Sequence, residues 1–214
     1  MDQMNAELGA LKTKYIDRDS RMRNVLAVRQ GRMRDVYPDM FPDGPFDRGI
    51  VANMIDVAAR DLAEVLAPMP SFNCESARTA SDAATKFAEK RTKIANGYLD
   101  LSNVQTQMYT AADRYFTYGF VPCIIEMDFD KRMPRIAFMD SVGAYPVYNR
   151  WGEIKGAYFV FFKTKNELVA EYPESARFLE NIHDGSSLIE VVRHHNDQMD
   201  CLFLPTIADG LMLE

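Results

Sequence analysis

The sequence has few of the residues that hold disulfides, metals or phosphates. Its 214 residues include only three cysteines, which are far apart and form no C-x-x-C pair, and three histidines. A disulfide framework or a zinc site is therefore not expected, and the cysteines are interpreted as reduced, mostly buried side chains. The sequence also contains no G-x-S-x-G nucleophile motif and no glycine-rich phosphate loop. We therefore expect no catalytic site, no cofactor and no metal.

Long apolar runs and an excess of basic residues are also missing. The longest apolar stretch, residues 156–162, has the length of a strand, far short of the roughly 18 residues that a membrane helix needs. The first residues include charged side chains with no apolar block behind them, so no secretory signal is expected. The net charge of −6 excludes a small basic protein that coats nucleic acid. These features predict a soluble protein, made in a cytosol, with no membrane partner.

Hydrophobic periodicity predicts helices followed by antiparallel strands. The spacing is helical up to Tyr118 and changes at Gly119 to the alternation of strands. The predicted helices cover residues 4–33, 47–66, 81–98 and 102–118. The predicted strands cover residues 121–129, 135–140, 145–149, 154–163, 188–195 and 201–205. This order indicates an α+β fold with a mainly helical part, residues 1–118, and an antiparallel β part, residues 119–214, with a helical insert over 164–182.

The same periodicity predicts which side chains are buried. In the second helix the apolar positions, which we expect to face the core, are Ile50, Met54, Ile55, Ala58, Leu62, Val65 and Leu66. In the first strand, Val121, Cys123, Ile125, Met127 and Phe129 alternate with Glu126, Asp128 and Asp130, so the strand is expected to bury its apolar side. Ser81 or Asp82 is a candidate N-cap for the helix over residues 81–98, and Ser102 is one for the helix that ends at Tyr118.

Positive charge is concentrated near the N-terminus. Residues 10–35 carry eight basic and three acidic side chains, although the whole chain is acidic. At about 100° per residue, five of the basic side chains share one stripe of the first predicted helix: Lys14, Arg18, Arg21, Arg29 and Arg32. Three interpretations remain open for this basic stripe, namely a solvated face, a contact with the acidic face of a neighbouring copy, and a contact with nucleic-acid phosphates.

The histidines, the acidic hairpin and four aromatic residues each allow both a functional and a purely structural interpretation. His194 and His195 are neighbours in a predicted strand, so their side chains point to opposite faces and cannot easily bind one metal. An enzyme that uses His195 with the acidic hairpin, through Glu126 or Asp128, is one alternative; the solvent face of a charged hairpin is the other. Four aromatic residues in predicted loops are possible interface anchors, or pack on their own domain: Tyr37, Phe41, Phe46 and Trp151.

Several segments carry a resemblance to a known family. A long charged helix leads to a loop with Tyr37-Pro, and the helix over residues 107–118 ends in a Tyr-Gly step that enters a strand. A later strand region carries an Asp, a Pro and Tyr148 before an Asn-Arg-Trp-Gly turn. Over roughly residues 18–200 the chain resembles the N-terminal, wing part of tailed-bacteriophage portal proteins, most of all those of actinobacteriophages. Asn149 stands where that family usually has Asp.

The resemblance implies a structural protein with a portal wing-like fold and no enzymatic activity. Portal subunits form a ring, usually of about twelve copies, at one capsid vertex, where it is the channel for DNA packaging and ejection. The implied partners are other copies of the chain, terminase, scaffold, head-tail connector and capsid proteins, with double-stranded DNA bound by the full-length ring. The implied location is the virion, and the host cytoplasm during assembly.

The family's stem, clip and crown come mainly from sequence beyond the matched region, so this chain is expected to lack them. Two alternatives to the portal hypothesis remain open. The first is a cytosolic interaction module that binds an acidic partner through the basic helix, and the second is a small α+β enzyme.

Overall fold

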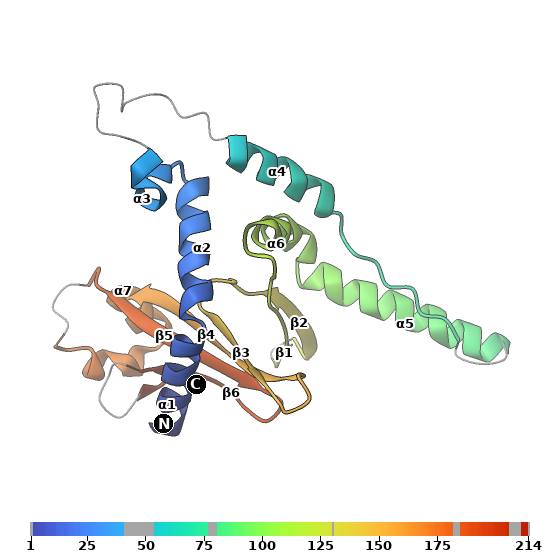
Figure 1. The fold of residues 1–214 in the computed structure, drawn as a ribbon. Helices are drawn as coiled ribbons and strands as arrows, with labels where there is room; N and C mark the ends of the chain where they lie inside the picture. Colours follow the sequence, from blue (N-terminus) through green and yellow to red (C-terminus); the bar gives the residue numbers. More distant parts are fainter. Residues whose placement is uncertain are drawn as a thin grey trace. The chain divides into compact units, whose positions relative to one another are not determined.

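The computed structural model describes residues 2–40, 54–76, 81–129, 131–181, 185–205 and 211–213 (Figure 1). Helices make up 52% and antiparallel sheets 23% of the chain, and the helices precede the strands, which confirms the α+β prediction. The N-terminal helices are α1 (Asp2–Lys14), α2 (Ile16–Arg29), α3 (Met33–Val36), η1 (Pro38–Met40), α4 (Met54–Leu66), α5 (Asp82–Leu101) and α6 (Val104–Tyr118). The later elements are β1 (Cys123–Asp128), β2 (Met133–Phe138), β3 (Ala144–Tyr148), β4 (Ile154–Thr164), α7 (Lys165–Glu171), η2 (Pro173–Phe178), β5 (Leu188–Asn196), β6 (Asp200–Leu204) and β7 (Leu211–Met212).

The chain forms two compact units. The first comprises residues 1–21 and 142–214, and the second comprises residues 22–141. The boundary between them near the N-terminus falls inside α2, after Arg21. This grouping joins α1 to the later strands and joins the hairpin β1–β2 to the helices, whereas the sequence analysis divided the chain by element type at residue 118.

In the first unit, helices cover both faces of the five-stranded antiparallel sheet β3-β4-β5-β6-β7. Leu8 of α1 is buried on one face, and Glu7 beside it accepts a hydrogen bond of 2.7 Å from the Tyr158 hydroxyl of β4. The buried partners of Leu8 are Tyr145, Tyr158, Val192, Cys201 and Phe203. On the other face, α7 and η2 contribute Leu168 and Leu179 to a second apolar cluster with Ile189, Val191, Leu204 and Leu213.

In the second unit, α6 lies between two neighbours, because α4 packs along it and β2 packs against α6 and α5. Two backbone N–H groups on the edge of β2 that does not pair with β1 donate hydrogen bonds to side chains at the ends of the neighbouring helices. The Ile136 N–H donates to Ser102 Oγ at 3.1 Å, and the Phe138 N–H donates to Gln107 Oε1 at 3.1 Å. The predicted capping role of Ser102 is therefore wrong, because its hydroxyl serves the strand and Asn103, with φ 51°, precedes α6 instead.

The ends of the other helices follow local chemistry. Ser81 caps α5 by accepting a hydrogen bond from the Ala84 N–H, as its position predicted. Gly119 ends α6 with φ 82°, a left-handed conformation that glycine adopts without strain. The first predicted helix, residues 4–33, is interrupted twice, at Tyr15 between α1 and α2 and at residues 30–32 between α2 and α3.

Two predicted buried faces are wrong. In β1 the buried residue is Ile124, whereas Ile125, Met127 and Phe129 are 65%, 53% and 84% exposed and Cys123 is exposed as well. Strand alternation puts alternate residues on one face but does not say which face meets the helices. In α4 the buried residue is Ala63, and most of the predicted apolar face is exposed; Ile50 lies outside the described residues.

Gly143 offers a test of the turn that leads into β3. Its φ is 81°, and a Cβ there would lie 2.4 Å from the Val160 carbonyl oxygen, whereas Gly152 has φ 80° and open space around it. We expect Gly143→Ala to lower the free energy of unfolding by about 3 kcal/mol, and Gly152→Ala by about 1 kcal/mol, because only the first adds a clash to the backbone strain. Urea unfolding followed by circular dichroism measures both values. Equal losses would contradict the close approach at Gly143.

Candidate functional site

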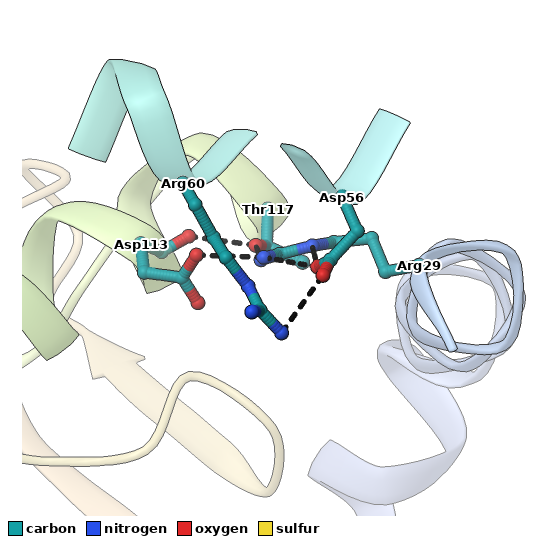
Figure 2. Close-up of polar contacts among 5 residues, drawn as sticks. All are labelled: Arg29, Asp56, Arg60, Asp113 and Thr117. Atoms are coloured by element: carbon teal, nitrogen blue, oxygen red, sulfur yellow. Dashed lines mark hydrogen bonds and ion pairs between the residues drawn. The ribbon is translucent and has the colours of Figure 1, made fainter. Parts of the chain in front are cut away.

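The most connected polar cluster of the second unit surrounds Arg29 at the end of α2 (Figure 2). The Arg29 guanidinium donates from Nε and Nη2 to Asp56 Oδ1 of α4, at 3.1 and 2.8 Å. Arg29 Nη2 also lies 2.7 Å from Asp113 Oδ1 of α6, and Nη1 donates to the Thr117 hydroxyl. Arg60 Nη2 lies 2.8 Å from the second oxygen of Asp56. One cation therefore joins three helices, and we call these five residues the Arg29 cluster.

The low exposure of Arg29, at the centre of the cluster, indicates a structural role. The Arg29 side chain is only 11% exposed, and a buried charge is tolerated when it is paired and hydrogen-bonded. The hydrogen bond to Asp113, followed by that to Asp56, raises the pKa of Arg29, although desolvation by burial acts in the opposite direction. The cluster therefore holds α2, α4 and α6 together while Arg29 stays charged.

A cleft of about 330 Å³ opens beside the Arg29 cluster. It is lined further by Thr110, Arg114, Tyr118 and Asp140. Arg114 Nη2 lies 3.3 Å from Asp140 Oδ2, and burial raises the pKa of the Tyr118 hydroxyl. Three arginines and three aspartates line the cleft and are paired with one another, so the cleft has no strong preference for an anion or a cation.

Arg18 and Arg29 of the basic stripe are engaged within the chain. In the first unit, Arg18 donates to Asp19 Oδ1 at 2.7 and 2.9 Å, and its guanidinium lies 4.4 Å from the Tyr15 ring centroid. Asp19 also accepts a hydrogen bond of 2.7 Å from the Tyr145 hydroxyl, and the pKa of Tyr145 is raised by desolvation and by this hydrogen bond. Arg29 is the buried centre of the cluster described above.

The other three residues of the basic stripe are exposed. Lys14 Nζ lies 5.3 Å from the ring centroid of Tyr15. Arg32 donates to Gln30 Oε1 and lies 3.5 Å from Asp35 Oδ2. Lys14, Arg21 and Arg32 are therefore the members of the stripe whose side chains remain at the surface.

The possible aromatic anchors divide in the same way. Tyr37 is exposed, and Trp151 is the more exposed of the two, with the Arg150 guanidinium 4.6 Å from its ring centroid. Phe41 and Phe46 lie outside the described residues. Trp151 is thus accessible to a partner at the turn between β3 and β4.

The two histidines lie in the first unit, whereas Glu126 and Asp128 lie in the second. The His194 ring is buried against Tyr158, with centroids 4.2 Å apart, and desolvation lowers its pKa. His195 Nδ1 lies 3.4 Å from Asp200 Oδ2. Over the described parts of the chain, no three His, Cys, Asp or Glu side chains gather closely enough to bind a metal ion.

The surface feature that the sequence analysis missed is apolar. Many large apolar side chains of the second unit are exposed, and α4 carries the most of them. They include Met54, Ile55, Val57, Leu62, Val65 and Leu66 on α4, Phe87, Ile94 and Leu101 on α5, Tyr109, Tyr115 and Phe116 on α6, and Ile125 and Met127 on β1. Monomeric proteins rarely expose large apolar patches, which usually mark interaction surfaces. The seven-residue spacing of Phe87, Ile94 and Leu101 was a visible signal for the α5 part.

Comparisons with known proteins leave the family open. The chain matches no model of a known protein family, and a search of curated proteins finds no relative. Among the helices of the described ranges, none is both long and apolar enough to cross a membrane.

The Arg29 cluster makes a direct prediction about stability. We expect Arg29→Met to lower the free energy of unfolding by about 3 kcal/mol, because it leaves Asp56 and Asp113 without their shared cation. Arg32→Met is the matched control on an exposed arginine and is expected to change it by less than about 0.5 kcal/mol. Urea unfolding measures both variants. Equal effects would mean that the cluster contributes nothing to the packing of the helices.

Proposed function

We propose that this protein is a structural subunit of a tailed-phage portal ring, which forms the capsid-vertex channel for DNA packaging and ejection. Its partners in this role are other copies of itself, terminase, scaffold, head-tail connector and capsid proteins, and the DNA that passes through the full ring. It acts in the virion, and in the host cytoplasm during assembly. The protein works in this role through surfaces that fit together, without a reaction centre.

The observation that carries the proposal is the exposed apolar surface of the second unit. A subunit of a closed ring needs two unlike surfaces that meet head to tail between neighbours. Here apolar side chains are exposed on α4 and on α5, two separate helices of one unit. Covering this surface in an assembly recovers roughly 25 cal/mol for each Å² of apolar area removed from water.

The order of elements in the segments that resemble portal proteins also supports the proposal. Helix α6 ends at Tyr118-Gly119 and leads into β1, and β3 precedes the turn at Asn149. In that turn Asn149 Oδ1 accepts hydrogen bonds from the Trp151 and Glu153 N–H groups, at 2.8 and 3.0 Å. An aspartate would accept the same bonds, so the departure from the family pattern preserves the turn.

The alternative of a module that binds an acidic partner through the basic stripe is less favoured. Arg18 and Arg29 already hold carboxylates of their own chain. The alternative of an enzyme built on His195 has less support, because His195 faces Asp200, which is itself paired with Arg193.

Electron microscopy and mass photometry of the purified full-length protein test the proposal. We expect closed rings of about a dozen copies. A protein that stays monomeric at concentrations up to about 100 µM would contradict it, because a ring contact needs at least micromolar affinity to persist in assembly.

A binding experiment distinguishes the alternative function, a module that binds an acidic partner. If the basic stripe bound an acidic partner, the protein would bind polyglutamate in a salt-sensitive way, and Lys14→Glu with Arg21→Glu would abolish that binding. We expect these two changes to leave rings intact, since the apolar surface is elsewhere. Loss of rings in this variant would assign the contact to the basic stripe.

A further inference from the structure

One side of α4 is apolar and uncovered. The helix packs against α6 through the side that carries Asp56 and the fully buried Ala63. On an adjoining arc of about 120°, five large apolar side chains share one stripe. We call Met54, Ile55, Leu62, Val65 and Leu66 the α4 stripe; they are between 47% and 71% exposed. Asp61 and Glu64, both exposed, lie along one edge of it.

One side of α5 is apolar and uncovered as well. Phe87, Ile94 and Leu101 recur every seven residues, are 57%, 44% and 61% exposed, and form what we call the α5 stripe. Ala88 and Leu99 are buried on another side of the helix. Lys86, Lys90 and Lys93 are exposed along one edge of the α5 stripe, and the exposed Asp82 and Asp100 lie next to them further around the helix.

The remaining side of α5 is occupied by the chain that leads to it from α4. The Phe72 N–H donates to Asn96 Oδ1 and the Cys74 N–H donates to Thr92 Oγ1, each at 2.9 Å. Asn96 Nδ2 returns a hydrogen bond of 3.0 Å to the Phe72 carbonyl. At about 100° per residue, Thr92 and Asn96 lie roughly opposite the α5 stripe. The connecting segment therefore covers the far side of α5 and leaves the stripe open.

We propose that the α4 stripe of one copy packs against the α5 stripe of the next copy. The two stripes match in length, because residues 54–66 and 87–101 span about 18 and about 21 Å of helix. Their edges have opposite charge, carboxylates on α4 and lysines on α5, which favours this pairing over α4 with α4 or α5 with α5. Because the two surfaces differ, each copy presents both, and the contact repeats from copy to copy.

This inference rests on the proposed ring function and names the surfaces that build it. It also accounts for two amphipathic helices whose apolar sides face water in a single copy. The apolar residues provide the contact area, and the charged edges set its direction.

Single charged substitutions test the contact. We expect Leu62→Glu, within the α4 stripe, and Ile94→Glu, within the α5 stripe, each to weaken self-association about 100-fold, because each buries an unpaired carboxylate in the contact. Leu188→Glu and Ile16→Glu are matched controls at exposed positions of the first unit and should assemble as the wild type does. Sedimentation velocity measures association, and circular dichroism checks that every variant is folded.

Mixing the two variants gives the decisive result. Leu62→Glu protein keeps an intact α5 stripe and Ile94→Glu protein keeps an intact α4 stripe, so the mixture should form a one-to-one dimer that grows no further. If Leu62→Glu protein is monomeric while Ile94→Glu protein still pairs, α4 binds α4 and the inference is wrong. If both variants still form rings, the inference is wrong while the ring function stands. If the wild type forms open chains that both variants abolish, the contact stands and the closed ring does not.

Charge reversal tests the direction of the pairing. We expect Asp61→Lys with Glu64→Lys, and separately Lys86→Glu with Lys90→Glu, each to weaken self-association about tenfold at low salt. Combining all four changes should restore association to within about threefold of the wild type, because the edges are again opposite in charge. Failure of the combined variant to recover would overturn the pairing of these two edges.

Discussion

A single, mostly covered guanidinium joins three helices of the second unit, α2, α4 and α6. Arg29 of α2 contacts Asp56 of α4 and Asp113 of α6 at the same time (Figure 2). Asp56 is seven residues before Ala63, so both lie on one side of α4 and that side must face α6. The rotation of α4 about its own axis is therefore set by the ion pair between its Asp56 carboxylate and Arg29.

That rotation explains why the apolar side of α4 is exposed. A helix with only an apolar stripe would turn that stripe toward its neighbour. In α4 the aspartate that meets Arg29 and the small residue that allows close approach to α6 occupy the inner side instead. The apolar residues are left outside, where a contact between copies can cover them. The ion pairs of Arg29 therefore help to decide which side of α4 is presented to solvent.

The sequence predicted the helix ends and the start of the strands that depend on residues close together in the chain. The cap at Ser81, the helix end at Gly119 and the change to strand alternation after it all depend on residues within one turn of each other. Ser102 was misread because its hydroxyl bonds to Ile136, which is distant in the sequence. Arg29 was grouped with the basic stripe because its partners Asp56 and Asp113 are distant in the sequence and helical spacing alone does not reveal them.

By itself the sequence determined the kinds of elements, their order and the two sides of each amphipathic helix and strand, because periodicity and capping act between near neighbours. The tertiary structure alone decided which of those sides is inside. Ile124 rather than Ile125 is buried, and Ala63 rather than Leu62 is buried on α4. The physical reason is that the side of a helix or strand that becomes buried depends on the neighbouring element. It depends on which distant side chain can approach closely or neutralise a charge. A repeating pattern within one element carries no information about that neighbour.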